Sequence, residues 1–133
     1  MKRLAVDTNN LVRLLVRDDS TQWDTARALF EANHVVLVLS VLLETEWVLR
    51  SRFDYGRETI SSLFDALART EMVELHEPER TERVLAAYRA GMDFADAVHV
   101  SGVRAGESFA TFDKDLARRA GSHFKTVSVE LAS

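Results

Sequence analysis

Short apolar runs and longer amphipathic stretches alternate along the chain. The clearest apolar run, Val35 to Leu39, is continuous in branched residues, which is typical of a strand covered on both faces of a parallel sheet. Four further runs are rich in strand-forming residues and are bordered by polar residues or glycine. They predict strands at residues 3–6, 72–75, 108–111 and 126–129.

Helices are predicted between these strands. Ser40 has the side chain of a helix cap at the start of an apolar stretch that ends near Arg52. Pro78 suits the first turn of a helix that Gly91 ends, and Asp93 begins the next one. The predicted helices cover residues 11–17, 21–33, 41–52, 58–70, 78–90, 93–105 and 114–120.

Strands that alternate with crossover helices predict a three-layer α/β/α fold with a mainly parallel central sheet and right-handed connections. The chain has 133 residues, of which 47% are hydrophobic and 29% charged, so we expect one domain over residues 1–133. In such folds a ligand binds beyond the carboxyl ends of the strands.

Composition excludes several kinds of chemistry. There is no cysteine, so disulfides, thiolate metal sites and thiol nucleophiles are excluded. A net charge of −4 argues against a broad basic surface, although it leaves a nucleic acid substrate possible. The first residues reach Asp7 before a signal-peptide stretch can form, and no run has membrane-spanning length. We therefore expect a cytoplasmic protein without membrane contact.

Four acidic residues occupy the positions where strands give way to helices. Asp7 directly follows the first strand, and Asp113 comes two residues after Thr111 closes the fourth. Glu44 lies one turn inside the helix that follows the second strand, and Asp96 lies at the opening of the helix before the fourth strand. We expect these carboxylates at one edge of the sheet, where hard divalent cations are commonly held.

Helix capping is an alternative role for most of these acids. Asp7 has the position of a cap for the first helix, and Asp93 with Asp96 has the spacing of a capping box. Asp113 and Asp115 fall at a helix start, where the helix dipole favours acidic residues. Taken singly, Asp7 and the pair Asp93 and Asp96 are better explained as helix caps than as metal ligands.

Glu44 is harder to explain as a cap. It shares a helical face with Val41, Trp47 and Val48, and a lone carboxylate on an apolar face is costly unless it is paired or bound to a metal. Glu46 has apolar neighbours too, so periodicity alone does not choose between the two glutamates.

Carboxylates gathered at one edge would repel each other, and a divalent cation would relieve that repulsion. Ligands that are all oxygen favour Mg²⁺ or Mn²⁺ over zinc, because the four histidines are scattered without ligand spacing. His99 is the one histidine near a candidate acid, one turn beyond Asp96.

Four ordered blocks carry a resemblance to a known family. Together they resemble PIN-domain proteins, in particular VapC-type toxins of toxin–antitoxin modules, from near residue 3 to about residue 129. The resemblance implies a PIN fold, a Mg²⁺- or Mn²⁺-dependent endoribonuclease, a homodimer and neutralisation by a cognate antitoxin. The blocks are Val6-Asp7-Thr8-Asn9-Asn10-Leu11-Val12-Arg13, Leu42-Leu43-Glu44-Thr45-Glu46-Trp47-Val48-Leu49, Asp93-Phe94-Ala95-Asp96-Ala97 and Thr111-Phe112-Asp113-Lys114-Asp115.

The resemblance also ranks the candidate residues. The family's four principal acids fall on Asp7, Glu44, Asp96 and Asp113, as metal ligands and catalytic residues. Less constant acidic positions and polar positions that orient ligands or substrate fall on Asp93, Asp115, Thr8, Asn9 and Thr111.

The implied reaction is hydrolysis of an RNA phosphodiester bond by a metal-activated water. Asp7, Asp96 and Asp113 would be the main ligands, and Glu44 would be a further ligand or a base. Arg13 and Lys114 are candidates for phosphate contact, although each is better explained as a solvated surface charge.

Other functions have weaker support. A phosphoacceptor receiver needs an aspartate at the end of the third strand, where the chain has Leu75-His76, and a nucleophilic phosphatase needs an aspartate at Asn9. A PIN-fold protein that binds RNA or a partner without turnover remains open, as does a solitary ribonuclease without a toxin role.

Overall fold

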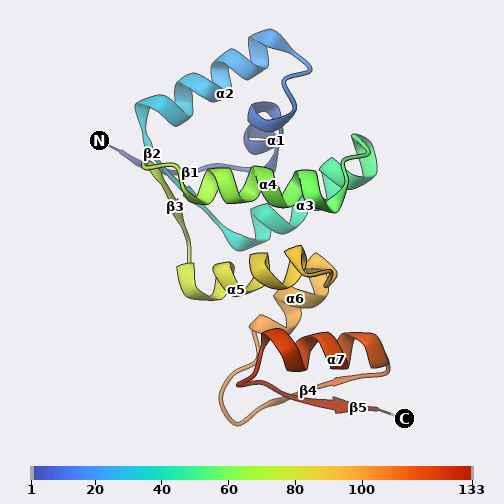
Figure 1. The fold of residues 1–133 in the computed structure, drawn as a ribbon. Helices are drawn as coiled ribbons and strands as arrows, with labels where there is room; N and C mark the ends of the chain where they lie inside the picture. The colour runs from blue at the N-terminus through green and yellow to red at the C-terminus, as the bar shows by residue number, and fades with distance from the viewer. Residues whose placement is uncertain (1, 133) are drawn as a thin grey trace. The chain divides into compact units, whose positions relative to one another are not determined.

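The computed structural model describes residues 2–132, which form seven helices and five strands (Figure 1). The chain divides into two compact units, Met1–Pro78 and Glu79–Ser133, named unit 1 and unit 2 below. Each unit contains a parallel sheet of its own. The prediction of one domain over residues 1–133 is not tested by this division and stays a prediction. Within residues 2–132, every helix is too short or too polar to cross a membrane.

Unit 1 is built on a three-stranded parallel sheet with the order β1-β2-β3. The central strand carries Val35 and Leu37, both fully buried, and Val35 pairs with Leu4 on one side and Val73 on the other. All three strands run in one direction, so the carboxyl ends of β1 and β2 share an edge, and α1 and α3 begin there. The elements are β1 (Arg3–Ala5), α1 (Thr8–Val16), α2 (Ser20–Ala32), β2 (His34–Leu37), α3 (Leu39–Arg52), α4 (Arg57–Ala68) and β3 (Val73–Leu75).

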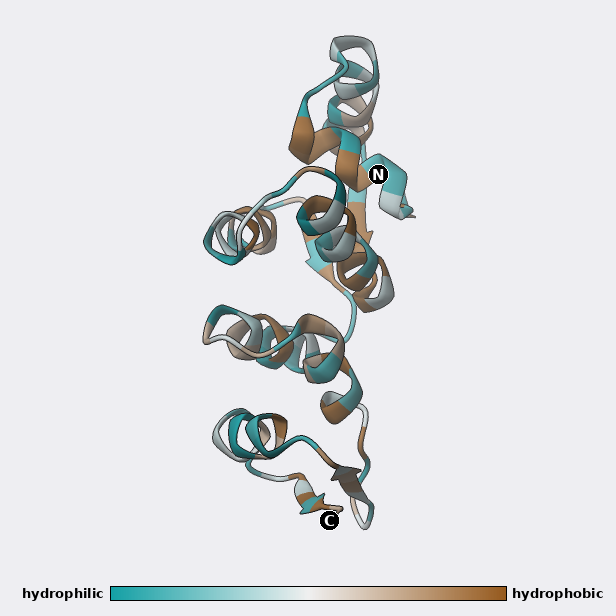
Figure 2. Ribbon diagram, turned by 90° about the vertical axis from the view of Figure 1, so that its right-hand side faces the viewer, coloured by the Kyte–Doolittle hydropathy of each residue, from teal (hydrophilic) through white to brown (hydrophobic). Residues whose placement is uncertain are grey.

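Apolar residues at helical spacing attach the helices of unit 1 to its core. Leu42 and Leu49 of α3 lie two turns apart, Ile60 and Phe64 of α4 lie one turn apart, and all four are buried. Helix α1 packs against α2 and α3, and α3 packs against α4. Figure 2 shows hydrophobic and hydrophilic segments alternating along these helices, as amphipathic packing requires.

Unit 2 joins helices to a two-stranded parallel sheet, in which β4 pairs with β5 along their length. Helix α7 packs against α6 and against both strands. The rings of Tyr88 and Phe94 meet edge to face, with 5.2 Å between centroids, and link α5 to α6. The elements are α5 (Pro78–Arg89), α6 (Phe94–Ser101), β4 (Ser108–Thr111), α7 (Lys114–His123) and β5 (Ser128–Leu131).

Gly91 ends α5 as predicted, and its backbone explains why. Its φ of 116° lies in the region that favours glycine, and a Cβ there would lie 2.6 Å from Nη1 of Arg119. That same Nη1 donates to the backbone oxygen of Ala90 at 3.1 Å. The positive φ is therefore the reason that this turn favours glycine, because the flexible end of Arg119 can shift away from a Cβ.

The structure confirms the predicted α/β class and parallel strands, and corrects several boundaries. Ser40 is not the cap of α3, because the helix already begins at Leu39 and the capping position is Val38. Helix α6 ends at Ser101, where Gly102 is the C-cap, and does not reach residue 105. Strand β5 lies two residues later than predicted, and α7 continues to His123.

Candidate functional site

Asp7 lies at the carboxyl edge of the first sheet, because β1 ends at Ala5 and buried Val6 anchors the connection. Its extended backbone makes it the N-cap of α1. Oδ1 accepts from the backbone N–H of Asn10 at 3.0 Å and from its Nδ2 at 2.9 Å. Both bonds use the same oxygen, so capping leaves Oδ2 of this exposed carboxylate for a ligand.

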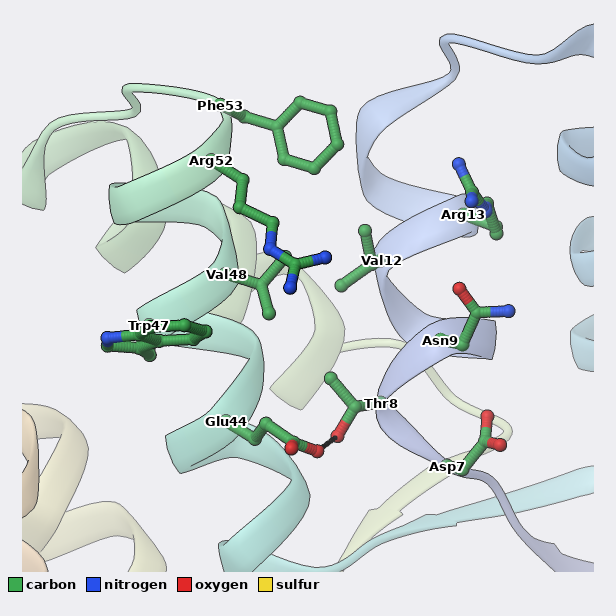
Figure 3. A pocket seen from close by; sticks show the side chains of 10 residues that line it. All are labelled: Asp7, Thr8, Asn9, Val12, Arg13, Glu44, Trp47, Val48, Arg52 and Phe53. Atoms are coloured by element: carbon green, nitrogen blue, oxygen red, sulfur yellow. Dashed lines mark hydrogen bonds between the residues drawn. The ribbon is translucent and has the colours of Figure 1, made fainter.

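Glu44 projects from α3 toward the first turn of α1. The hydroxyl of Thr8 donates a hydrogen bond to Oε1 of Glu44 (Figure 3). Glu44 shares its side of α3 with Trp47 and Val48, as expected, but its side chain is exposed, so it does not carry the cost of a buried lone carboxylate. The buried glutamate is Glu46, which is 2% exposed and accepts from Nε of Arg50 at 2.8 Å. An intrahelical ion pair explains Glu46, which leaves Glu44 free to act outside the core.

Asp7 and Glu44, the two principal acids of unit 1, line a common pocket of about 410 Å³ between α1 and α3 (Figure 3). In Figure 3 the side chain of Thr8 lies between the carboxyl groups of Asp7 and Glu44. The pocket brings together five residues that the sequence singled out, Asp7, Thr8, Asn9, Arg13 and Glu44, and adds apolar side chains and Arg52 around them. Its lining is Asp7, Thr8, Asn9, Val12, Arg13, Glu44, Trp47, Val48, Arg52 and Phe53.

Unit 2 repeats the use of aspartate at helix starts. Asp93 caps α6, with Oδ2 accepting from the N–H of Asp96 at 3.1 Å. Asp113 caps α7, with Oδ1 accepting from the N–H groups of Asp115 and Leu116 at 2.9 and 3.1 Å. The backbone N–H of Asp113 in turn donates to Oγ1 of Thr111 at 3.0 Å. Thr111 therefore fixes the turn that presents Asp113 after β4.

The acids of unit 2 differ in their electrostatic surroundings. Partial burial raises the pKa of Asp96, the negative charges of Asp93 and Asp113 raise it further, and nearby His99 opposes them. Hydrogen bonds from Arg119 and Arg118 lower the pKa of exposed Asp115. Asp96 thus stands among other carboxylates, whereas two arginines already occupy Asp115. This contrast supports the lower rank of Asp115 as a metal ligand.

The donors suit a hard cation. In three capping aspartates, Asp7, Asp93 and Asp113, the recorded bonds use a single oxygen each, so helix capping and ligation are compatible. The repulsion felt by Asp96 is what a cation would relieve. Within residues 2–132, no three histidine or acidic side chains form a group ready to hold a metal ion. The carboxylate chemistry fits Mg²⁺ or Mn²⁺, and the full ligand set stays a prediction.

The described residues place the predicted acids in two sets. Asp7 and Glu44 line the pocket of unit 1, and Asp96 interacts electrostatically with Asp93 and Asp113 in unit 2. In the sequence Trp47 stands out only as an apolar neighbour of Glu44, and no pattern marks Arg52 and Phe53 as the pocket residues that they are. The signal available for Trp47 was its place three residues after Glu44, on the same side of one helix.

Comparison with protein families decides the classification. Residues 4–122 match the family model of the PIN domain, and all four principal acids lie inside this segment. The chain belongs to the PIN domain family. No curated protein and no solved structure matches the chain. The helices and parallel strands described above are consistent with the three-layer PIN fold.

PIN domains are generally metal-dependent nucleases, so membership of the family supports a hydrolase of phosphodiester bonds. The match includes the secondary candidates Thr8, Asn9, Asp93, Thr111 and Asp115. It covers parts of both units, from β1 to the penultimate residue of α7.

Proposed function

We propose that this PIN domain is a Mg²⁺- or Mn²⁺-dependent endoribonuclease that acts on cytoplasmic RNA, and that it is the toxin of a VapC-type toxin–antitoxin module. The observation that carries the proposal is the presence of all four acids, Asp7, Glu44, Asp96 and Asp113, within the matched segment. The resemblance of the four sequence blocks to VapC-type toxins adds the choice of RNA and the toxin role.

The four acids have two kinds of task in this proposal. Asp7, Asp96 and Asp113 would hold the cation, directly or through water. Asp7 and Asp113 would use the carboxylate oxygen that helix capping leaves free, whereas Asp96 lies in the first turn of α6, where Asp93 is the cap. Glu44 lies outside the core with Thr8 fixing one of its oxygens, so its other oxygen can ligate or accept a proton from the attacking water. When bound, the cation supplies an acidified water and positive charge beside the scissile phosphate.

The proposed partners follow from the same family resemblance. They are an RNA substrate, a cognate antitoxin protein and a second copy of the chain in a homodimer. A solitary ribonuclease would share the chemistry and lack the antitoxin, whereas a non-catalytic module would bind RNA or a partner and leave the phosphodiester bond intact.

Cleavage of RNA by the purified chain tests the proposal. Total RNA is incubated with Mg²⁺ or Mn²⁺, with chelator, and with the Asp7→Asn variant, and the new ends are mapped. We expect discrete cleavage that needs both the cation and Asp7. Equal cleavage by the variant or in chelator would contradict the assigned chemistry, and no cleavage in any condition would favour the binding-module alternative.

A further inference from the structure

The pocket of unit 1 extends well beyond its two acids. Asp7 and Glu44 line it together with Arg52 and Phe53 at the other end of α3 (Figure 3). Its volume of about 410 Å³ lies at the lower end of the roughly 300–1,000 Å³ range of small-ligand sites. That size suits one unpaired nucleotide better than a duplex.

Arg52 offers a positive charge on this wall. Its guanidinium extends from α3 toward α1 in Figure 3, and its central carbon lies 6.0 Å from the centroid of the Trp47 ring. Across residues 2–132, Arg52 makes no ion pair, whereas Arg50 is bound to Glu46 and Arg13 to Asp18. An arginine in the last turn of a helix is favoured by the dipole alone. The dipole does not explain why Arg52 lies on a pocket wall next to an aromatic ring.

Trp47 supplies that ring. It remains 50% exposed, although tryptophan is normally highly buried. It follows Glu44 by three residues, so both project from neighbouring positions on one side of α3. Exposed aromatic rings beside arginines are the usual platform for single-stranded nucleic acid, because bases stack on the ring and phosphates pair with the guanidinium.

We infer that Trp47 and Arg52 form a subsite for one nucleotide of single-stranded RNA next to the cleaved phosphate, with Trp47 stacking on the base and Arg52 binding a phosphate oxygen. The inference rests on the proposed function, whose acids lie in the same pocket. It selects RNA over a protein segment because the wall offers an unneutralised guanidinium to a polyanion.

Fluorescence anisotropy with a short labelled single-stranded RNA measures the subsite directly, in chelator so that metal-dependent cleavage is suppressed. The full-length variants are Trp47→Leu, Trp47→Phe and Arg52→Gln. The matched control is Arg69→Gln, which removes an exposed charge of unit 1 outside the pocket. Far-ultraviolet circular dichroism checks folding, which these exposed positions should not impair.

We expect Trp47→Leu to raise the Kd about fivefold or more, and Trp47→Phe to retain most of the affinity because it keeps an aromatic face. Arg52→Gln should weaken binding and flatten the slope of log affinity against log salt by about 0.7. Arg69→Gln should bind like the unmodified chain. If Trp47→Leu were to misfold, the salt slope of Arg52→Gln would still decide the question.

Cleavage by the same variants in Mn²⁺ separates this inference from the proposed function. Binding that depends on Trp47 and Arg52 without any cleavage would support the subsite and contradict the nuclease. Cleavage by Trp47→Leu and Arg52→Gln with unchanged Kd and KM would support the nuclease and overturn the subsite. Absence of RNA binding by the unmodified chain would overturn it as well. One further result would overturn the subsite: Trp47→Leu changes the oligomeric state in sedimentation while its RNA affinity stays unaltered. The surface around Trp47 would then be a contact between copies of the chain.

Discussion

The hydroxyl of Thr8 donates a hydrogen bond to Oε1 of Glu44, and so joins the first residue of α1 to the second turn of α3. Asp7, the residue before Thr8, caps the same helix. One turn of backbone thus positions Asp7 and orients Glu44. The contact links the two acids of unit 1 without requiring them to touch.

Thr8→Val should lower kcat for RNA cleavage about tenfold, which corresponds to about 1.4 kcal/mol in the transition state. The valine keeps the shape of the side chain and removes the donor that fixes Glu44. Single-turnover cleavage measures the effect, and Thr8→Ser should restore most of the rate. Equal rates for Thr8→Val and the unmodified chain would show that the bond does not orient a working group.

Asp7→Asn and Asp7→Ala separate capping from catalysis. Asparagine is as good an N-cap as aspartate, whereas alanine costs about 1 kcal/mol of stability. Both variants should lose cleavage by about a hundredfold or more, on the scale of removing a catalytic group. Thermal unfolding should show a lower Tm for Asp7→Ala alone. Retained cleavage in Asp7→Asn would mean that Asp7 is only a cap.

Asp96→Asn should stabilise the metal-free protein. Burial and the charges of Asp93 and Asp113 hold the pKa of Asp96 above its ordinary value of 3.8, so its ionised form opposes folding. Stability is therefore highest below the unfolded-state pKa and declines as pH rises through the folded-state pKa. The variant should have a higher Tm than the unmodified chain near neutral pH, and the difference should vanish below about pH 3.8.

Thermal scans of Asp96→Asn across pH, all in chelator, test this sign. A lower Tm than the unmodified chain at neutral pH would show that the carboxylate is stabilising, and would remove one argument for a cation between these acids. Added Mg²⁺ or Mn²⁺ should raise the Tm of the unmodified chain more than that of the variant, because a ligand stabilises the state that binds it.

The two neighbouring glutamates of α3 should respond in opposite ways. Glu46→Gln weakens an ion pair whose carboxylate is buried and whose arginine is half exposed, so it should cost about 1–2 kcal/mol of unfolding free energy. Glu44→Gln should leave stability nearly unchanged and reduce cleavage. Chemical denaturation and cleavage rates compare the pair. A stability loss at Glu44 with full activity would reverse the assignment.

The sequence predicted the order of helices and strands because each element carries its own periodicity and end signals. It failed where long-range packing decides. Ser40 has a capping side chain, yet α3 begins one residue earlier, and the backbone of Val38 accepts the first bonds. Burial of Glu46 and exposure of Glu44 depend on how α3 rotates against its neighbours, and both residues have apolar neighbours in sequence.

The four acids were accessible from sequence because three of them stand at or next to strand ends and helix starts, where local signals are strong. The role of Arg52 could not be predicted from sequence, because the helix dipole already explains a basic residue near a helix end. Only the fold places it on the wall of a pocket that Asp7 and Glu44 also line. Long-range placement thus distinguishes Arg52 from Arg50, the other arginine of α3.

The most direct test of the central claim compares single-turnover RNA cleavage by Asp7→Asn, Glu44→Gln, Asp96→Asn and Asp113→Asn in Mn²⁺. Asp24→Asn, an exposed acid of α2, is the matched control. If the four carboxylates serve one metal-dependent site, each of the four variants should lose at least about a hundredfold in rate while remaining folded, and Asp24→Asn should cleave like the unmodified chain. Full activity in the variants of either unit would contradict a shared site.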